Sequence, residues 1–226
     1  MKKLLLIMAL LGSAVMAQPS DSDFGEWPRT YFASIGFNVI ANRGDFTDHT
    51  AQIKYEDKPE QTISFPITRV LVSPDYNIGV NIREFSLAGS FQYWSMMGTI
   101  GNDYPDEIKE QKMRYWRFGA EFTYNFFYPD RFQVGLGLGY SYTSIKTNNS
   151  AYDSKAYSNA EIMGSGIALI SNMKYFLTEF FALSPSLRIY ENWFKAANTR
   201  STGTQDFDSY VWQTYVAVSI NAMFQF

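Results

Sequence analysis

Residues 210–226 alternate strictly between two kinds of side chain. Bulky residues fill most of the even positions, whereas the odd positions between them are mostly small or polar. Successive side chains of a β-strand point to opposite faces, so a period of two with one bulky face predicts a strand and excludes an amphipathic helix. The bulky face comprises Tyr210, Trp212, Thr214, Val216, Val218, Ile220, Ala222, Phe224 and Phe226.

The same period recurs from residue 31 onward and gives about eight segments in all. Each is long enough for the roughly nine to eleven tilted residues that cross a bilayer as a strand. The weakest lies at residues 67–78, because Pro66 and Pro74 lack a backbone N–H and predict a frayed or bulged strand. The other segments are 31–40, 84–96, 114–128, 132–144, 164–176 and 181–190.

The connections between these segments alternate in length. Residues 79–83, 128–131 and 177–180 are short, as tight antiparallel turns require. The connections 42–65, 97–113, 145–163 and 191–208 are long, polar and without an apolar period. Short turns on one side and long loops on the other are typical of outer-membrane barrels, whose turns are periplasmic and whose loops are extracellular.

The N-terminal residues predict export. Lys2 and Lys3 precede an apolar run at residues 4–11. The following segment ends in Val15-Met16-Ala17, a small-residue pattern that suits cleavage before Gln18. This order is typical of a cleaved signal peptide, which we assign to residues 1–17. Residues 18–30 are then a short periplasmic arm, and residues 31–226 form the barrel.

The aromatic content supports a membrane location. Aromatic residues make up 18% of the chain and charged residues only 18%. Amphipathic rings collect where hydrocarbon meets water, and the rings here concentrate at strand ends. Tyr115 and Tyr190 are assigned to the girdle beside the long loops. The girdle residues that we single out are Trp94, Trp116, Trp193 and Trp212 at the loop ends, and Tyr31, Tyr128 and Tyr175 at the turn ends.

These features predict an all-β fold, a closed antiparallel up-and-down transmembrane β-barrel. Small and polar residues fit a crowded lumen, so the bulky face meets lipid. Backbone groups at membrane depth have no water to bind, so the first strand must pair with the last.

The final strand carries a family resemblance. Its alternate apolar residues, with a terminal aromatic, resemble the C-terminal signal of outer-membrane barrels that the barrel-insertion machinery recognises; we assign this role to Phe226, Phe224, Ile220 and Val218. In size, strand number and loop asymmetry the chain resembles the small OmpA/OmpX-type barrels. That resemblance implies a bacterial outer-membrane location and contact with outer-membrane lipids and lipopolysaccharide. The peptidoglycan-binding domain of the longer members does not follow Phe226.

Six ionic residues share the inward parity of four strands: Arg69, Asp75, Arg117, Glu121, Lys174 and Arg188. A cation turned outward would cost about 2–4 kcal/mol near the bilayer midplane. Because side chains fill an eight-stranded barrel, we expect these groups to meet in a hydrogen-bonded plug. A narrow ion path is the alternative.

No catalytic, cofactor or metal site is predicted. The chain has no cysteine, which excludes disulfides and thiolate chemistry, and its acidic clusters lack calcium-loop spacing. Its single histidine, His49, lies in a predicted loop without the rigid partners of a catalytic triad. A net charge of -3 gives no sign of a nucleic-acid partner.

We therefore expect a non-enzymatic outer-membrane barrel, a rigid mount for surface loops that mediate interaction or adhesion and contribute to envelope integrity. The loop ligand stays open. The alternatives are a small passive pore, a lipid A-modifying enzyme that uses His49, and a soluble periplasmic lipocalin-like carrier.

Overall fold

A computed structural model describes residues 30–43, 50–53, 61–64, 70–99, 110–128, 132–148, 160–178, 180–199 and 203–226. The predicted signal peptide and residues 18–29 of the predicted arm lie outside these ranges, as do His49 and Arg69. The last arm residue, Thr30, is the first residue of a strand.

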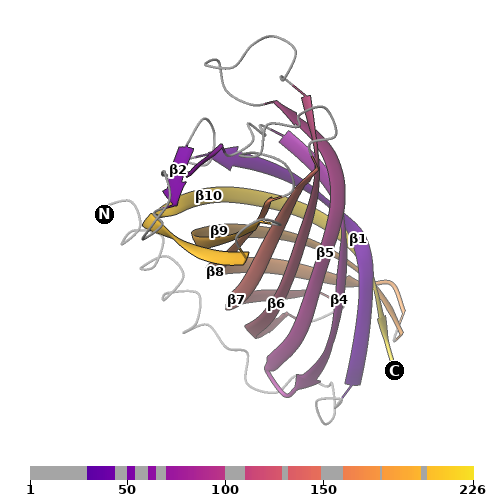
Figure 1. The fold of residues 1–226 in the computed structure, drawn as a ribbon. Coiled ribbons are helices and arrows are strands. Elements are labelled where there is room, and N and C mark those ends of the chain that lie inside the picture. The colour runs from indigo at the N-terminus through magenta and orange to yellow at the C-terminus, as the bar shows by residue number, and fades with distance from the viewer. Residues whose placement is uncertain are drawn as a thin grey trace.

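Eight long antiparallel strands form a closed barrel (Figure 1), so the predicted fold class is confirmed. The order around the wall is β1-β10-β9-β8-β7-β6-β5-β4, and β4 returns to β1. The strands are β1 (Thr30–Arg43), β4 (Val70–Ile82), β5 (Phe85–Thr99), β6 (Glu110–Tyr128), β7 (Phe132–Asn148), β8 (Ala160–Phe176), β9 (Phe181–Thr199) and β10 (Gly203–Gln225).

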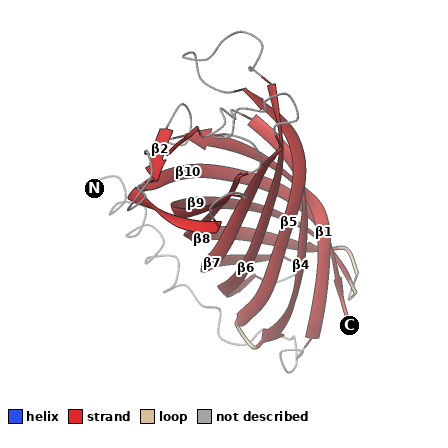
Figure 2. Ribbon diagram, in the orientation of Figure 1, coloured by secondary structure: helices blue, strands red, loops and turns tan. Residues whose placement is uncertain are grey.

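A short hairpin adds to the barrel between β1 and β4. It consists of β2 (Thr50–Ile53) and β3 (Gln61–Ser64), and β2 contacts β10. Figure 2 shows that strands account for nearly all of the described chain. Below, the end with the β4–β5 and β8–β9 turns is called the turn end, and the opposite end is the loop end.

The first and last strands close the wall, as predicted. Their register runs from Phe32 opposite Gln225 to Arg43 opposite Thr214. At the turn end Tyr31 and Phe226 exchange two backbone hydrogen bonds of 2.9 Å. At the turn end, the pairing of β1 with β10 therefore extends to Phe226.

The strands extend further toward the loop end than predicted, and the expectation that residues 191–208 form a polar loop is wrong. Strand β9 continues to Thr199, and β10 begins at Gly203. Here the alternation is inverted, because Phe194 and Ala197 are buried inside while Lys195 and Asn198 are exposed outside. Outward positions that contact water rather than lipid can be polar. The alternation in residues 191–208 therefore lacks the apolar outer face by which a membrane strand is predicted.

The predicted turn at residues 79–83 is also shifted. Strand β4 continues to Ile82, and the chain reverses at Arg83 and Glu84 before β5 begins at Phe85. Arg83 has a φ of 53°, a left-handed conformation that suits a tight hairpin turn.

Strand β4 pairs unequally with its two neighbours. Its ladder with β1 begins at Val70 and passes Pro74, which lies opposite Phe37. Its described ladder with β5 begins later, at Tyr76 opposite Phe91. In the described parts of β4 and β5, no residues are paired beyond Tyr76 and Phe91 in the direction of the loop end. The irregularity expected from a proline without a donor is thus confined to the β5 side.

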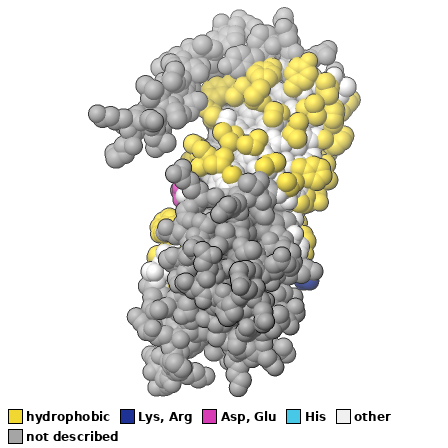
Figure 3. Space-filling model, turned by 90° about the horizontal axis from the view of Figure 1, so that it is seen from above, with side chains coloured by type: hydrophobic (Ala, Val, Ile, Leu, Met, Phe, Trp, Pro, Cys, Tyr) yellow, Lys and Arg dark blue, Asp and Glu magenta, His cyan; other side chains and the backbone are white. Residues whose placement is uncertain are grey.

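The two faces of the wall differ as predicted. On β6, Phe118 and Phe122 are 51% and 50% exposed on the outside, whereas Arg117 and Glu121 are 1% and 6% exposed in the lumen. Figure 3 shows hydrophobic side chains covering most of the described surface seen from above, with few charges among them. Such a surface suits contact with acyl chains.

Closure makes Gly36 on β1 intolerant of a side chain. A Cβ there would overlap the Ile220 carbonyl oxygen and the Asn221 side chain on β10, whereas a Cβ at Gly89 on the outer wall meets nothing nearer than the Ile78 carbonyl oxygen at 3.9 Å. We expect Gly36→Val to destabilise the barrel by about 1–3 kcal/mol through overpacking, and Gly89→Val to have little effect. Urea titration with unheated gel mobility as the readout measures both; equal midpoints would contradict this account of closure.

Candidate functional site

An ion pair joins opposite parts of the lumen wall. Arg188 on β9 donates from Nε and Nη2 to the two carboxylate oxygens of Glu121 on β6, at 3.0 and 3.1 Å. Its Nη1 lies 3.3 Å from Oδ2 of Asp75 on β4. All three residues are buried, and each points inward because it has the inward parity of its strand.

Arg117 completes the group. Its Nη2 lies 3.9 Å from Oε1 of Glu121, and its Nε donates to Gln92 at 3.0 Å. Its guanidinium also lies over the Tyr190 ring, 4.3 Å from the centroid. We call Asp75, Arg117, Glu121 and Arg188 the charge cluster.

Neutral side chains satisfy the carboxylate of Asp75. It accepts hydrogen bonds from Gln92 at 3.1 Å, Asn77 at 3.2 Å and Asn221 at 2.9 Å. Buried charges are stable only when both partners and hydrogen bonds replace water, and here both are present. The bond from Gln92 also links β5 to β4 where their backbone ladder has ended.

Lys174 lies apart from the charge cluster, toward the turn end. Its Nζ donates to Asn81 at 3.5 Å, Ser86 at 3.2 Å and Asn125 at 3.3 Å. A cavity of about 40 Å³ lies between Lys174 and Arg188, with room for a few water molecules. Of the six predicted ionic residues, the structure therefore brings four together, places Lys174 in a separate layer, and leaves Arg69 outside the described residues.

Above the charge cluster, toward the loop end, the lumen holds mainly apolar and aromatic side chains, with the hydrogen-bonded pair of Asn192 and Gln213 among them. The rings of Tyr190 and Tyr215 stack with centroids 4.3 Å apart, and the Tyr190 ring lies over the Arg117 guanidinium. The expectation that small and ionic residues fill the whole lumen is wrong here. The layer, which we call the apolar layer, comprises Ile40, Tyr115, Ile145, Ile162, Tyr190, Phe194, Phe207, Val211 and Tyr215.

Two tyrosines assigned to the outer girdle belong to this layer. Tyr115 is 2% exposed and Tyr190 is fully buried. Each lies two residues from a cation of the charge cluster, Arg117 or Arg188, and therefore shares its inward face. Strand parity places both tyrosines in the lumen, and the same rule places Gln92 and Asn221 there.

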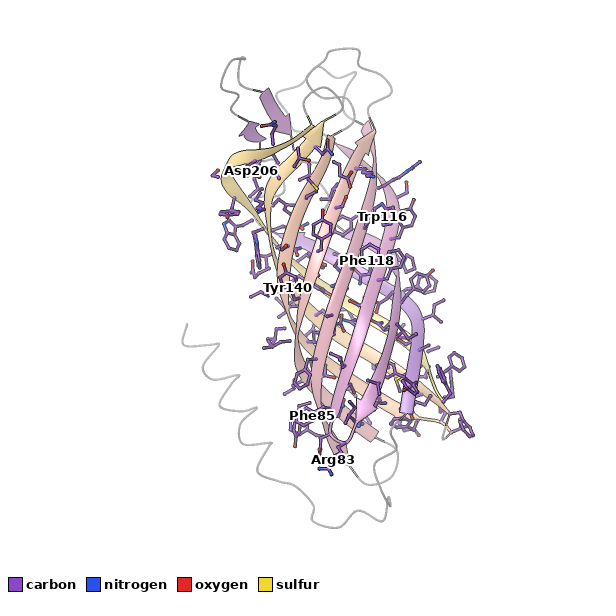
Figure 4. The ribbon with its side chains drawn as sticks, turned by 60° about the horizontal axis from the view of Figure 1, so that its bottom comes forward. Arg83, Phe85, Trp116, Phe118, Tyr140 and Asp206 are labelled. Carbon is purple, nitrogen blue, oxygen red and sulfur yellow. The ribbon has the colours of Figure 1, made fainter. Side chains whose placement is uncertain are left out.

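The other girdle residues with described side chains face outward. Near the loop end, Trp116 packs edge-on against Tyr93 with ring centroids 5.6 Å apart. The ring centroids of Trp193 and Trp212 are 6.0 Å apart. At the turn end Tyr31 and Tyr175 are exposed. The side chains of Trp94 and Tyr128 lie outside the described set. Figure 4 shows Trp116, Phe118, Tyr140 and Phe85 projecting from the outer wall.

The four residues of the predicted insertion signal also lie on this outer face. Val218, Ile220, Phe224 and Phe226 are all exposed. Phe224 packs against Phe181 of β9 at 5.1 Å, and Phe226 lies 6.5 Å from Tyr31 of β1. A protein that binds β10 from outside the barrel would therefore contact the rings of Phe224 and Phe226.

Two further features concern the described residues alone. They contain no helix long and apolar enough to cross a membrane. Nor do they contain a group of three or more His, Asp or Glu side chains placed to hold a metal ion.

The closed barrel defines the class: the chain has the fold of the small eight-stranded outer-membrane barrels. Two solved structures illustrate the likeness. Neisserial surface protein A superposes with a TM-score of 0.54 at 12% identity, over 88% of this chain and 100% of that one. The outer membrane protein OprG from Pseudomonas aeruginosa gives a TM-score of 0.58 at 11% identity, over 89% and 98%. No family model and no curated protein matches the sequence.

The charge cluster predicts a large stability effect at Arg188. Arg188→Gln leaves the carboxylates of Asp75 and Glu121 buried without their main partner, which costs about 3–5 kcal/mol. Lys146→Gln is the control, since it breaks a 3.2 Å pair with Glu161 that is half exposed on the outer wall and is worth less than about 1 kcal/mol. Urea midpoints of the refolded variants compare the two; a similar small loss in both would show that the cluster contributes little.

Proposed function

We propose that this protein is a non-conducting barrel of a bacterial outer membrane that holds its surface loops as a rigid mount. The observation that carries the proposal is the filling of the lumen by buried side chains. Two layers of different chemistry fill it in succession: the charge cluster and, toward the loop end, the apolar layer.

The layers oppose ion passage in different ways. In the charge cluster, the arginines bind the protein's own carboxylates, so few free charges remain to replace the hydration shell of a passing ion. In the apolar layer, Phe194, Ile145 and Ile162 are fully buried against one another. The polar groups at that level are few, such as the tyrosine hydroxyls and the Asn192–Gln213 pair, so an ion crossing it would lose its water for little polar replacement. The arrangement supports a plug rather than a water-filled path.

The outer wall supports the membrane location. Exposed apolar side chains cover the strands between two levels of aromatic rings, as lipid-facing surfaces require. In this proposal, residues 1–17 direct export and the outward face of β10 carries the insertion signal. The two similar structures, named as a surface protein and an outer membrane protein, agree with that assignment. Outer-membrane lipids and lipopolysaccharide are then the surrounding partners.

The loop end supports the role as a mount. All long connections leave from this end because the strands are antiparallel, and a rigid barrel fixes where they emerge. The β2–β3 hairpin shows that the longest connection, between β1 and β4, carries ordered structure of its own against β10. Interaction or adhesion through such loops is the proposed activity. We assign no catalytic role, because the acids and bases of the charge cluster bind each other in the filled lumen.

Planar-bilayer recording of the refolded protein tests the seal. We expect no unitary currents from the native chain, whereas Arg117→Ser with Tyr190→Ser removes the contact between the two layers and should admit ions. Tyr140→Ser is the matched control, since Tyr140 is exposed on the outer wall, and it should stay silent. Stable unitary currents from the native chain would favour the passive pore over the mount.

A further inference from the structure

Two cations face each other on the outer wall near the loop end. Arg114 on β6 lies directly opposite Lys146 on β7, and both side chains are exposed. Like charges directly opposite on neighbouring strands destabilise a sheet unless an anion lies between them or beside them. The pair therefore needs a negative partner.

The protein itself supplies one carboxylate for the two cations. Glu161, opposite Lys146 on β8, accepts from Lys146 at 3.2 Å and from the Ser144 hydroxyl at 2.6 Å. Within the described part of the chain, Arg114 has no carboxylate partner. The three residues carry one net positive charge, located on the β6 side of the group.

The girdle sets the height of this group relative to the membrane. Trp116 lies two residues from Arg114 on the same face of β6, and its ring packs against Tyr93. With the usual rise and tilt, two residues raise Arg114 by about 5 Å above the ring. Because such rings mark the edge of the hydrocarbon, Arg114 and Lys146 lie at the level of lipid headgroups.

The opposite end of the wall has no such pair among its described residues. There the outward positions next to the turns are apolar or aromatic, such as Ile82, Phe85 and Phe181. Arg83 is a single exposed cation in the β4–β5 turn. The paired cations thus distinguish the loop-side leaflet from the other.

We infer that Arg114 and Lys146 bind the phosphate of an anionic lipid headgroup in the loop-side leaflet. A guanidinium donates two parallel hydrogen bonds to phosphate oxygens, and the neighbouring ammonium adds a point charge. Glu161 holds Lys146 in place, while the lipid's acyl chains lie along the apolar wall below Trp116. The inference rests on the membrane location proposed above.

Spin-label EPR of lipids around the refolded full chain tests this site. The protein is placed in phosphatidylcholine vesicles with a trace of spin-labelled phosphatidic acid or spin-labelled phosphatidylcholine, and the motionally restricted fraction of each is compared. We expect the native chain to favour phosphatidic acid by about fivefold, the ratio that one net charge near a membrane surface gives. Arg114→Gln with Lys146→Gln should abolish this preference.

Two controls separate the site from general attraction. Arg83→Gln removes one cation at the turn end and should leave most of the preference intact, and Arg114→Lys with Lys146→Arg keeps both charges and should retain it. An excess of inorganic phosphate should not displace the lipid. Displacement by phosphate, equal restriction of the two lipids, or an unchanged preference in the double Gln variant would overturn the inference.

The same samples distinguish this failure from that of the proposed function. A compact unheated gel band together with no lipid preference would remove the phosphate site and leave the barrel in place. Absence of the compact band from every sample, the native chain included, would remove both.

Discussion

The pairing of backbone groups is the constraint on which the rest of this structure depends. Hydrocarbon offers no hydrogen-bond partners, so a sheet that crosses it must close. Here closure falls to β1 and β10, whose ladder ends at the mutual bonds of Tyr31 and Phe226. Closure divides every strand into an outer and an inner face, and the alternation of the sequence then decides which side chain meets lipid and which enters the lumen.

Filling the lumen is the second requirement, and the chain meets it with two kinds of chemistry. Midway along the barrel, Arg188 spans the interior to reach Glu121 and Asp75, which ties three strands together through one side chain. Nearer the loops, the stacked rings of Tyr190 and Tyr215 join that group to an apolar layer. The charge cluster fixes strand positions by geometry, while the apolar layer excludes water by packing.

Much of this could be predicted from the sequence. The period of two identifies the strands and the inward position of Arg117, the alternating lengths of the connections indicate antiparallel neighbours, and the lack of backbone partners in lipid requires closure. Strand ends near the loops could not be read in the same way, since the outer wall there, as at Lys195, no longer needs to be apolar. Aromatic identity favours the outer girdle for Tyr115 and Tyr190, whereas their parity places both in the lumen. The separation of Lys174 from the charge cluster depends on its height in the barrel, which parity does not give.

The central claim is that the bulky face of each strand contacts acyl chains, while the residues on the opposite face are enclosed in the lumen. Spin labels at Phe122 and Thr123 test it most directly, because these consecutive residues of β6 are 50% and 4% exposed on opposite faces. In lipid vesicles, the label at Phe122 should relax strongly with dissolved oxygen and weakly with an aqueous nickel chelate, and the label at Thr123 should respond poorly to both. Strong relaxation of the Phe122 label by the aqueous chelate would contradict the account.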